Sequence, residues 1–243
     1  QGLSDQPALR GALLSDLGAI YASLGDGDRA LHLLGNARDT LLALPDADPD
    51  ELARVWLRLA ETQLQTSGFD AAARSSDAAL ALLRDRPLSD ALRLQGELLR
   101  TRIDEETDQL DAAQQRIEGV VTTLRAGAAD AARLSEALAA LGNLRRLQTR
   151  YEEATALHAE ALTLARSVDP DDPVIATRLH ELASAQQQTS QPAAAIPLLR
   201  EAYALHLRLH GPRHPQTLST EGELAQALAT RAEYAEAEPL LRR

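Results

Sequence analysis

The chain has 243 residues and a formal net charge of −11; 44% of its residues are hydrophobic, only 2% are aromatic, and none is cysteine. Without cysteine the protein has no disulfide framework, no thiolate metal site and no thiol nucleophile. The acidic balance disfavours general affinity for nucleic acid, which needs excess positive charge along one face. No apolar run is long enough to cross a bilayer and no signal peptide is visible, so we expect no membrane contact.

All 25 basic residues are arginine, whereas lysine and methionine are absent. We interpret the missing lysine as the codon bias of a GC-rich bacterial genome. Because the chain opens at Gln1, we expect it to be part of a longer protein. The lack of cysteine fits a cytoplasmic location and a periplasmic or extracellular one equally well, so the sequence leaves the localisation open.

A motif returns every 41 or 42 residues along the chain. It consists of a leucine followed by glycine or alanine, a polar turn, and a small alanine twelve residues after the first small residue. The small residues pair as Gly18/Ala30, Ala60/Ala72, Gly142/Ala154, Ala183/Ala195 and Ala225/Ala237. A fixed period of this length is the signature of a solenoid built from one repeated unit. The small residues mark places where two helices approach closely, and a larger side chain there would cost roughly 1–3 kcal/mol.

In chain order, the repeats are predicted at 7–46, 49–87, 89–128, 131–169, 173–211 and 215–243, the last one truncated. Within each repeat, two amphipathic stretches are separated by a short polar break, which predicts an antiparallel helical hairpin. The sequence therefore predicts an all-α superhelix, a solenoid of about five and a half hairpins forming a single domain over 1–243.

Loops rich in proline, glycine and aspartate separate the repeats and end the preceding helices. Asp48-Pro49, Asp172-Pro173 and His214-Pro215 each combine a capping residue with a proline, which favours the first turn of a helix.

Repeat three departs from the pattern. The position of its small residue is assigned to Arg100, so we expect a local distortion or a longer turn near Asp104–Asp108. The acidic residues in that stretch are interpreted as a solvated face; the alternative is that they attract a basic partner.

Candidate catalytic and metal-binding motifs are weak. His206, His210 and His214 are four residues apart, but a Gly-Pro follows His210, so His210 is expected to end one helix and His214 to cap the next. No phosphate-binding loop, nucleophile elbow or zinc-protease motif is present. We therefore expect no enzyme activity, no metal and no cofactor in this chain.

Several residues stand at the spacing of one repeat family: Leu14, Leu17, Gly18, Tyr21, Ala30 and Ala37 in repeat one, and Trp56, Leu59, Ala60, Ala72 and Ala79 in repeat two. Together they resemble the tetratricopeptide repeat family. The long period and the loop HGPRHPQT at 210–217 resemble the type seen in kinesin light chains and in many bacterial signalling proteins.

In that family the first helix of each repeat lines a groove that contacts an extended or helical peptide. Carried over by position, the resemblance places these residues in the groove: Arg54, Leu57, Glu61, Leu64, Gln65, Glu136, Asn143, Arg146, Leu147, His180, Ser184, Gln187, Gln188 and Gln226. Asn143, Arg146 and His180 would form a donor-rich patch for a carboxylate or a peptide backbone. The alternative is that these are ordinary polar residues without a dedicated ligand.

The resemblance implies a scaffold that binds a protein or peptide partner. Long repeats in lysine-free, arginine-rich sequence also resemble segments attached to bacterial serine/threonine protein kinases, which implies a sensory or partner-recruiting region. The alternative function is self-assembly into a homo-oligomer. The family's chaperone-tail clamp relies on lysine, which is absent here.

Overall fold

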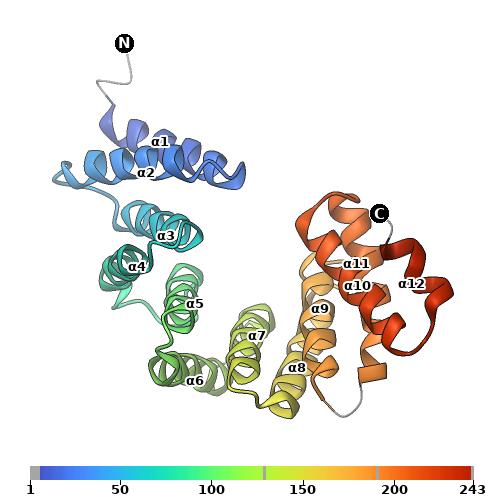
Figure 1. The fold of residues 1–243 in the computed structure, drawn as a ribbon. Coiled ribbons are helices and arrows are strands. Elements are labelled where there is room, and N and C mark those ends of the chain that lie inside the picture. The colour runs from blue at the N-terminus through green and yellow to red at the C-terminus, as the bar shows by residue number, and fades with distance from the viewer. Residues whose placement is uncertain (1–5, 128–129, 190–191, 242–243) are drawn as a thin grey trace. The chain divides into compact units, whose positions relative to one another are not determined.

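The computed structural model describes residues 6–127, 130–189 and 192–241, whose regular structure is entirely helical (Figure 1). The predicted all-α class is therefore confirmed. The helices are α1 (Pro7–Ser23), α2 (Gly27–Leu42), α3 (Pro49–Gln65), α4 (Phe69–Leu83), α5 (Ala91–Glu106), α6 (Leu110–Ala126), α7 (Ala131–Leu147), α8 (Tyr151–Val168), α9 (Val174–Gln187), the 3-10 turn η2 (Pro192–Ala194), α10 (Ala195–His210), α11 (Pro215–Thr230) and α12 (Tyr234–Leu241).

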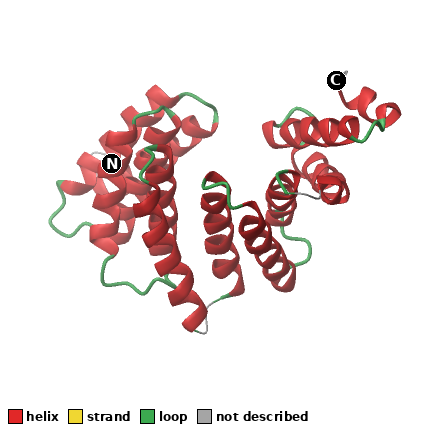
Figure 2. Ribbon diagram, turned by 60° about the horizontal axis from the view of Figure 1, so that its bottom comes forward, coloured by secondary structure: helices red, strands yellow, loops and turns green. Residues whose placement is uncertain are grey.

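The chain divides into two compact units, Gln1–Thr123 and Leu124–Arg243. In the first unit the first helices of successive repeats touch, α1 with α3 and α3 with α5; in the second, α7 touches α9 and α9 touches α11. Figure 2 shows only helices joined by loops and turns. Each unit is therefore a stack of hairpins in chain order, as the repeat period predicts.

Side-chain caps hold the helix starts where the sequence predicts them. The Asp48 side chain accepts the Asp50 N–H at 3.0 Å at the start of α3, and the Asp172 side chain accepts the Val174 N–H at 2.8 Å at α9. At α11 the His214 ring takes the same role, since its Nδ1 accepts the Gln216 N–H at 3.3 Å. These bonds satisfy backbone donors that the first helical turn leaves unpaired.

The small residues of the repeat lie where the two helices of a hairpin meet. Both members of every pair are buried, and an ideal Cβ on Gly18 would come within 2.7 Å of the Leu34 side chain. The same construction on Gly142 would meet the His158 ring at 2.7 Å. The predicted close approach is thus confirmed, because no larger side chain fits without displacing a neighbour.

The tight turn inside each described hairpin contains one residue in the left-handed region. These residues are Gly25 (φ 80°), Ser67 (φ 60°), Asp108 (φ 58°), Thr149 (φ 59°) and Ala232 (φ 62°). The N–H of the following residue bonds back to the helix, for example from Arg150 to the Arg145 carbonyl at 2.8 Å. The predicted break of repeat five, at Thr189–Gln191, lies partly outside the described residues.

This turn corrects the interpretation of repeat three. The small residue stands seven positions before the left-handed residue in the other described repeats, and in repeat three that position is Thr101, not Arg100. Thr101 is 1% exposed and its hydroxyl donates to the Glu97 carbonyl at 2.9 Å. The expected distortion near Asp104–Asp108 is also wrong, because α5 ends in the same tight turn as its counterparts.

Asp104 corrects a second expectation, that the acidic run of repeat three is solvated. Asp104 is only 1% exposed; it pairs with Arg100 one turn earlier and lies 3.4 Å from the Arg116 guanidinium of α6. Arg116 also reaches Glu97 at 2.9 Å. Repeat three thus joins its two helices through a partly buried ionic cluster.

Thr149→Gly is expected to raise the free energy of unfolding by about 0.5–1 kcal/mol, because a β-branched residue is strained at φ 59°. The gain is less than the strain relieved, since glycine also adds entropy to the unfolded chain. Urea denaturation measures the difference. Thr163→Gly, at an exposed site inside α8, is the matched control and should destabilise by about 0.3 kcal/mol. Equal effects at both positions would contradict the assignment of strain to Thr149.

Candidate functional site

The first helices of neighbouring repeats are linked by side chains on their polar faces. In the first unit Arg58 of α3 donates to Asp16 of α1 at 2.8 Å, and Arg102 of α5 donates to Glu61 of α3 at 3.1 Å. Glu61 is one of the predicted groove residues. Exposed pairs of this kind contribute at most about 1 kcal/mol each. Because these charges are already paired with each other, this face offers a ligand little uncompensated charge.

The other predicted groove residues of repeat two divide between surface and core. Arg54 is exposed and pairs with Glu51 within α3, and Gln65 is exposed at the end of that helix. Leu57 and Leu64 are only 2% and 6% exposed and belong to the core that α3 shares with α4 and α5. Their assignment to the groove surface is therefore wrong.

In repeat four, Asn143 and Arg146 lie near the end of α7, where Asn143 is half-buried and Arg146 is exposed. Among the described residues, neither side chain makes a hydrogen bond or ion pair. His180 of α9 is different, since its Nε2 lies 2.8 Å from Glu223 of α11. Of the three residues in the predicted donor-rich patch, His180 is therefore already engaged across the repeat boundary.

A pocket of about 500 Å³ joins repeats five and six, and it contains three of the predicted residues. It is lined by Gln187, Gln188, Ala193, Gln226, Ala227, Thr230 and Arg231. The glutamines come from the ends of the first helices α9 and α11, as predicted, whereas Ala193 and Arg231 come from turns and were not predicted. Because those two follow their helices, the helical spacing gave no signal for them.

The pocket offers uncharged donors and acceptors. Nε2 of Gln187 is buried and has no hydrogen-bond partner among the described residues. An unpaired buried amide typically costs about 1–3 kcal/mol, so this group favours a ligand that can pair with it. The ends of α9 and α11 add partial negative charge, which favours N–H donors on such a ligand. Arg231 is paired with Glu233 at 3.0 Å.

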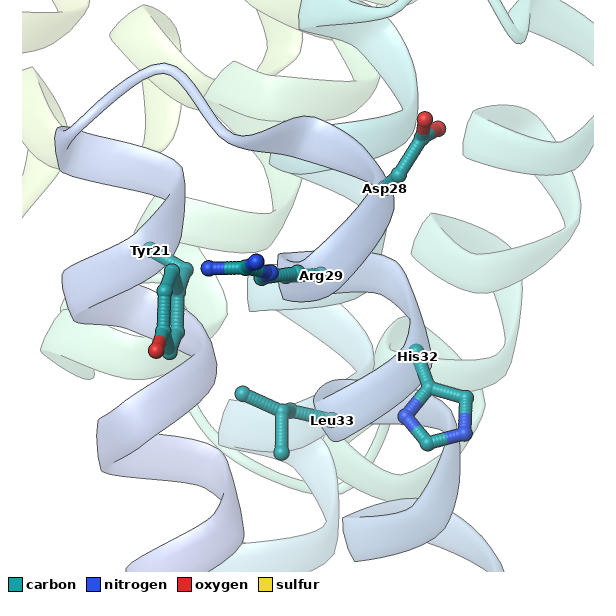
Figure 3. A pocket seen from close by; sticks show the side chains of 5 residues that line it. All are labelled: Tyr21, Asp28, Arg29, His32 and Leu33. Carbon is teal, nitrogen blue, oxygen red and sulfur yellow. The ribbon is translucent and has the colours of Figure 1, made fainter.

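A second pocket, of about 390 Å³, lies on the first hairpin and is lined by Tyr21, Asp28, Arg29, His32 and Leu33. Figure 3 shows the Arg29 side chain pointing toward the Tyr21 ring and Asp28 pointing away from it. The Arg29 guanidinium carbon is 5.5 Å from the ring centroid and the group is 3.3 Å from Asp26. None of these residues was a predicted site residue, and Arg29 is held by its own hairpin.

Two buried histidines of the second unit are held neutral. Burial lowers the pKa of His158 to about 4, despite the opposing Glu181 carboxylate 3.8 Å from its Nδ1. Burial also lowers the pKa of His206, and the nearby rings of His180 and His210 act in the same direction. The Thr220 hydroxyl donates to the Gln216 carbonyl, so His206 Nδ1–H donates to Thr220 at 3.0 Å.

The histidine series takes the structural roles that the sequence predicts. His210 is the last residue of α10, Gly211 turns the chain with φ 81°, and His214 caps α11 while its ring stacks on that of His210 at 4.3 Å. No group of three or more histidine, cysteine or acidic side chains within the described residues is arranged to hold a metal ion. Nor does any helix among them have the length and apolarity that a bilayer crossing requires.

Stacked α-hairpins with a recurring small-residue pair define an α-α superhelical repeat protein. The family model of the tetratricopeptide repeat matches residues 133–208 and 179–243, and the earlier repeats share the period and the turn. Residues 133–243 thus match the tetratricopeptide repeat family, and the fold of the chain is similar to that of kinesin-light-chain-like repeat structures. No curated protein has a matching sequence.

Solved structures with the same fold include the putative kinesin light chain repeats of Podosopora anserina, at 22% identity and a TM-score of 0.64 over 80% of this chain and 92% of that one. BtubC (BKLC) from P. vanneervenii matches at 19% identity and 0.68 over 88% and 87%. The Rap conjugation gene regulator of plasmid pLS20, in complex with the Phr* peptide, matches at 14% identity and 0.71 over 89% and 61%. At these identities the likeness concerns the fold.

Proposed function

We propose that this chain is a non-catalytic scaffold that binds a protein or peptide along the first helices of its repeats. The observation that carries the proposal is the pocket between repeats five and six, where three glutamines gather and the buried amide nitrogen of Gln187 has no partner among the described residues. A carboxamide both donates and accepts, as a peptide backbone does. A similar fold in the Rap regulator of pLS20 is seen with a peptide, which agrees with this assignment.

The internal ion pairs support a neutral polar ligand. Glu61 is paired with Arg102 and His180 contacts Glu223, so binding that relied on either side chain would first have to break that contact. The glutamine pocket needs no such rearrangement. Further proposed contacts for the partner are Arg54 and Gln65 in the first unit, and Asn143 and Arg146 in the second.

We further propose that the scaffold is the sensory or partner-recruiting region of a larger bacterial signalling protein, such as a serine/threonine kinase. The support is the resemblance of its long, lysine-free repeats to segments attached to such kinases. Phosphorylation assays on the product of the complete gene test this proposal. A complete gene without a kinase domain would overturn the kinase assignment and leave the peptide-binding proposal standing.

Selection from a displayed random-peptide library tests the binding proposal. Peptides enriched on the wild-type chain should bind the double variant Gln187→Ala/Gln226→Ala roughly tenfold or more weakly, because two amide partners are removed. Isothermal titration calorimetry with the enriched peptides measures the change. Gln115→Ala, on the second helix α6, is the matched control and should bind as the wild type does.

The pair Asn143→Ala/Arg146→Ala distinguishes the pocket from the surface of repeat four. Loss of binding in this variant with full binding by the glutamine variant would move the site to repeat four. Unchanged binding in both variants would contradict the proposed surface. Failure to enrich any peptide would argue against a peptide ligand altogether.

A further inference from the structure

Repeats five and six meet through buried polar side chains, at positions that are apolar where repeats one and two meet. Alignment on the small residues of the repeats matches His206, Thr217, Thr220 and Glu221, in this order, with Leu41, Leu52, Val55 and Trp56. The four polar residues are at most 6% exposed. Three of their counterparts are buried in one apolar cluster, and Trp56 packs against it. Hydrogen bonds therefore replace part of the apolar packing that joins the first two repeats.

His206 of α10 is the centre of this contact. Its Nδ1–H donates to Thr220 of α11 at 3.0 Å, whereas its Nε2 is buried without a hydrogen-bond partner among the described residues. In the neutral ring Nε2 carries no proton. Protonation would add an N–H donor and a positive charge at this buried atom, which is costly without an acceptor. The contact of α10 with α11 is therefore strongest while His206 is neutral.

Four histidine rings follow one another across the contact, and we call them the histidine row: His180, His206, His210 and His214. Successive ring centroids are 6.4, 6.0 and 4.3 Å apart. At these distances a positive charge on one ring disfavours a charge on the next. Burial and the three other rings together lower the pKa of His206. Acidification therefore brings mutually repelling charges into one contact.

The two ends of the row respond to protonation in opposite ways. Nδ1 of His214 accepts the Gln216 N–H at the start of α11, and it can do so only without a proton. A charged His214 would lose this cap and would also oppose the positive end of the α11 dipole. A charged His180, by contrast, would strengthen its contact with Glu223, 2.8 Å away. Protonation thus weakens the attachment of α11 through His206 and His214 and strengthens it through His180.

The other charged side chains on the elements around His206 have partners of their own or lie in solvent. They are Glu221 with Tyr203, Glu223 with His180, Arg178 with Glu181, Arg200 with Glu236 and Glu201 with Arg166, together with the exposed Arg208 and Arg213. Histidine is the side-chain type that changes its charge between about pH 5 and pH 8. The histidine row is therefore the part of this contact that responds to mild acid.

The glutamine pocket depends on the same contact, because its lining comes from the ends of α9 and α11 and from the turns after them. His180 lies two helical turns before Gln187 on α9, and Glu223 lies one turn before Gln226 on α11. The two walls of the pocket therefore stay together only while α11 remains packed on α9 and α10.

We propose that the histidine row is a pH switch for peptide binding: at neutral pH it keeps α11 against α9 and α10, and in mild acid it releases α11 and separates the two walls of the glutamine pocket. The inference rests on the proposed function, since it assigns a regulation to the same pocket. The stability that neutral His206 contributes is complete above the ordinary histidine pKa of 6.5 and is lost as the pH falls below it.

Hydrogen–deuterium exchange with mass spectrometry at about pH 7.5 and pH 5.5 tests the release of α11. His158→Leu serves as the parent chain, so that the acid sensitivity of His158 does not add to the result. After correction for the intrinsic effect of pH on exchange, fragments of α11 should exchange roughly tenfold faster at the lower pH, whereas fragments of α7 should not change. Equal exchange of α11 at both pH values, or the same acceleration in α7 and α11, would overturn the proposal.

Three histidine variants of this parent locate the effect. His206→Leu restores the residue of the contact between repeats one and two and should make exchange of α11 independent of pH. His214→Asn keeps a capping side chain that does not titrate and should reduce the acceleration. His32→Leu, at an exposed site in repeat one, should leave the acceleration unchanged. Far-ultraviolet circular dichroism checks that each variant is folded, and full acceleration in both His206→Leu and His214→Asn would contradict the assignment.

Binding measurements test the consequence for the pocket. Histidine-free peptides enriched on the chain at about pH 7.5 should bind roughly tenfold more weakly at pH 5.5, whereas His206→Leu should bind them equally at both pH values. Equal affinity of the parent chain at both pH values, with α11 released, would refute regulation of the pocket by the row. If no peptide is enriched, the proposed function fails and its regulation with it, while the exchange experiment still decides whether acid releases α11.

Discussion

Replacing Asp104 with alanine is expected to lower the free energy of unfolding by about 3 kcal/mol. The carboxylate is 1% exposed and interacts with Arg100 and Arg116, whose side chains are 14% and 28% exposed. Removing it leaves two partly buried guanidinium groups with less compensation. Both keep one acidic partner, because Arg100 reaches Asp77 at 3.0 Å and Arg116 reaches Glu97 at 2.9 Å. The expected loss is therefore at the lower end of the range for a broken buried pair.

Urea denaturation of the variants measures this effect against a neighbouring control. Glu106→Ala removes an exposed carboxylate from the same acidic run and should change stability by no more than about 0.5 kcal/mol. A double-mutant cycle with Arg116→Ala should give a coupling energy of about 0.5–3 kcal/mol. If Asp104→Ala were as mild as Glu106→Ala, the ionic cluster would not hold the two helices of repeat three together.

The hairpin architecture was predictable because its signals are local and repeated. A small residue such as Gly18 must recur wherever helices approach closely, and proline or glycine must recur between repeats. Repeat three was misassigned because its small position holds Thr101, which does not look small beside glycine and alanine. The register becomes clear from the left-handed turn at Asp108, a conformation that its residue type alone does not show.

Burial of Asp104 was not predictable from its position among other acidic residues. A charge run normally indicates solvent, and only packing of α5 on α6 brings Arg116 to the carboxylate. The residues of the binding surface could not be fully predicted either, because spacing along one helix does not distinguish a groove residue from a core residue such as Leu57. It also does not reveal Arg231, which the turn after α11 places in the pocket.

Acidification from pH 7 to pH 4 is expected to lower the free energy of unfolding by about 3 kcal/mol through His158 alone. The pKa of His158 is about 4 in the folded chain, against 6.5 for an ordinary histidine. Between pH 6.5 and pH 4, His158 is therefore mostly protonated in the unfolded chain and mostly neutral in the folded chain. The stability contributed by the neutral ring is complete above pH 6.5 and is lost progressively as the pH falls to about 4.

His158→Leu should remove that part of the pH dependence. The counterparts of His158 in repeats one and five are Leu34 and Leu199, both fully buried, so the site accommodates leucine in other hairpins. Both ring nitrogens of His158 are buried without hydrogen-bond partners among the described residues, so the variant should also be at least as stable at pH 7.

Chemical denaturation at pH 7 and at pH 4 measures both effects, with the exposed His32→Leu as control. His206 should leave a residual dependence of the same sign, because burial lowers its pKa too. An unchanged pH dependence in His158→Leu would show that His158 titrates normally in the folded chain. A weaker pH dependence of stability in His158→Leu would show that His158 is a buried, neutral imidazole at a position where other repeats have leucine. Protonation of this ring would then weaken the contact of α8 with α7 beside Gly142.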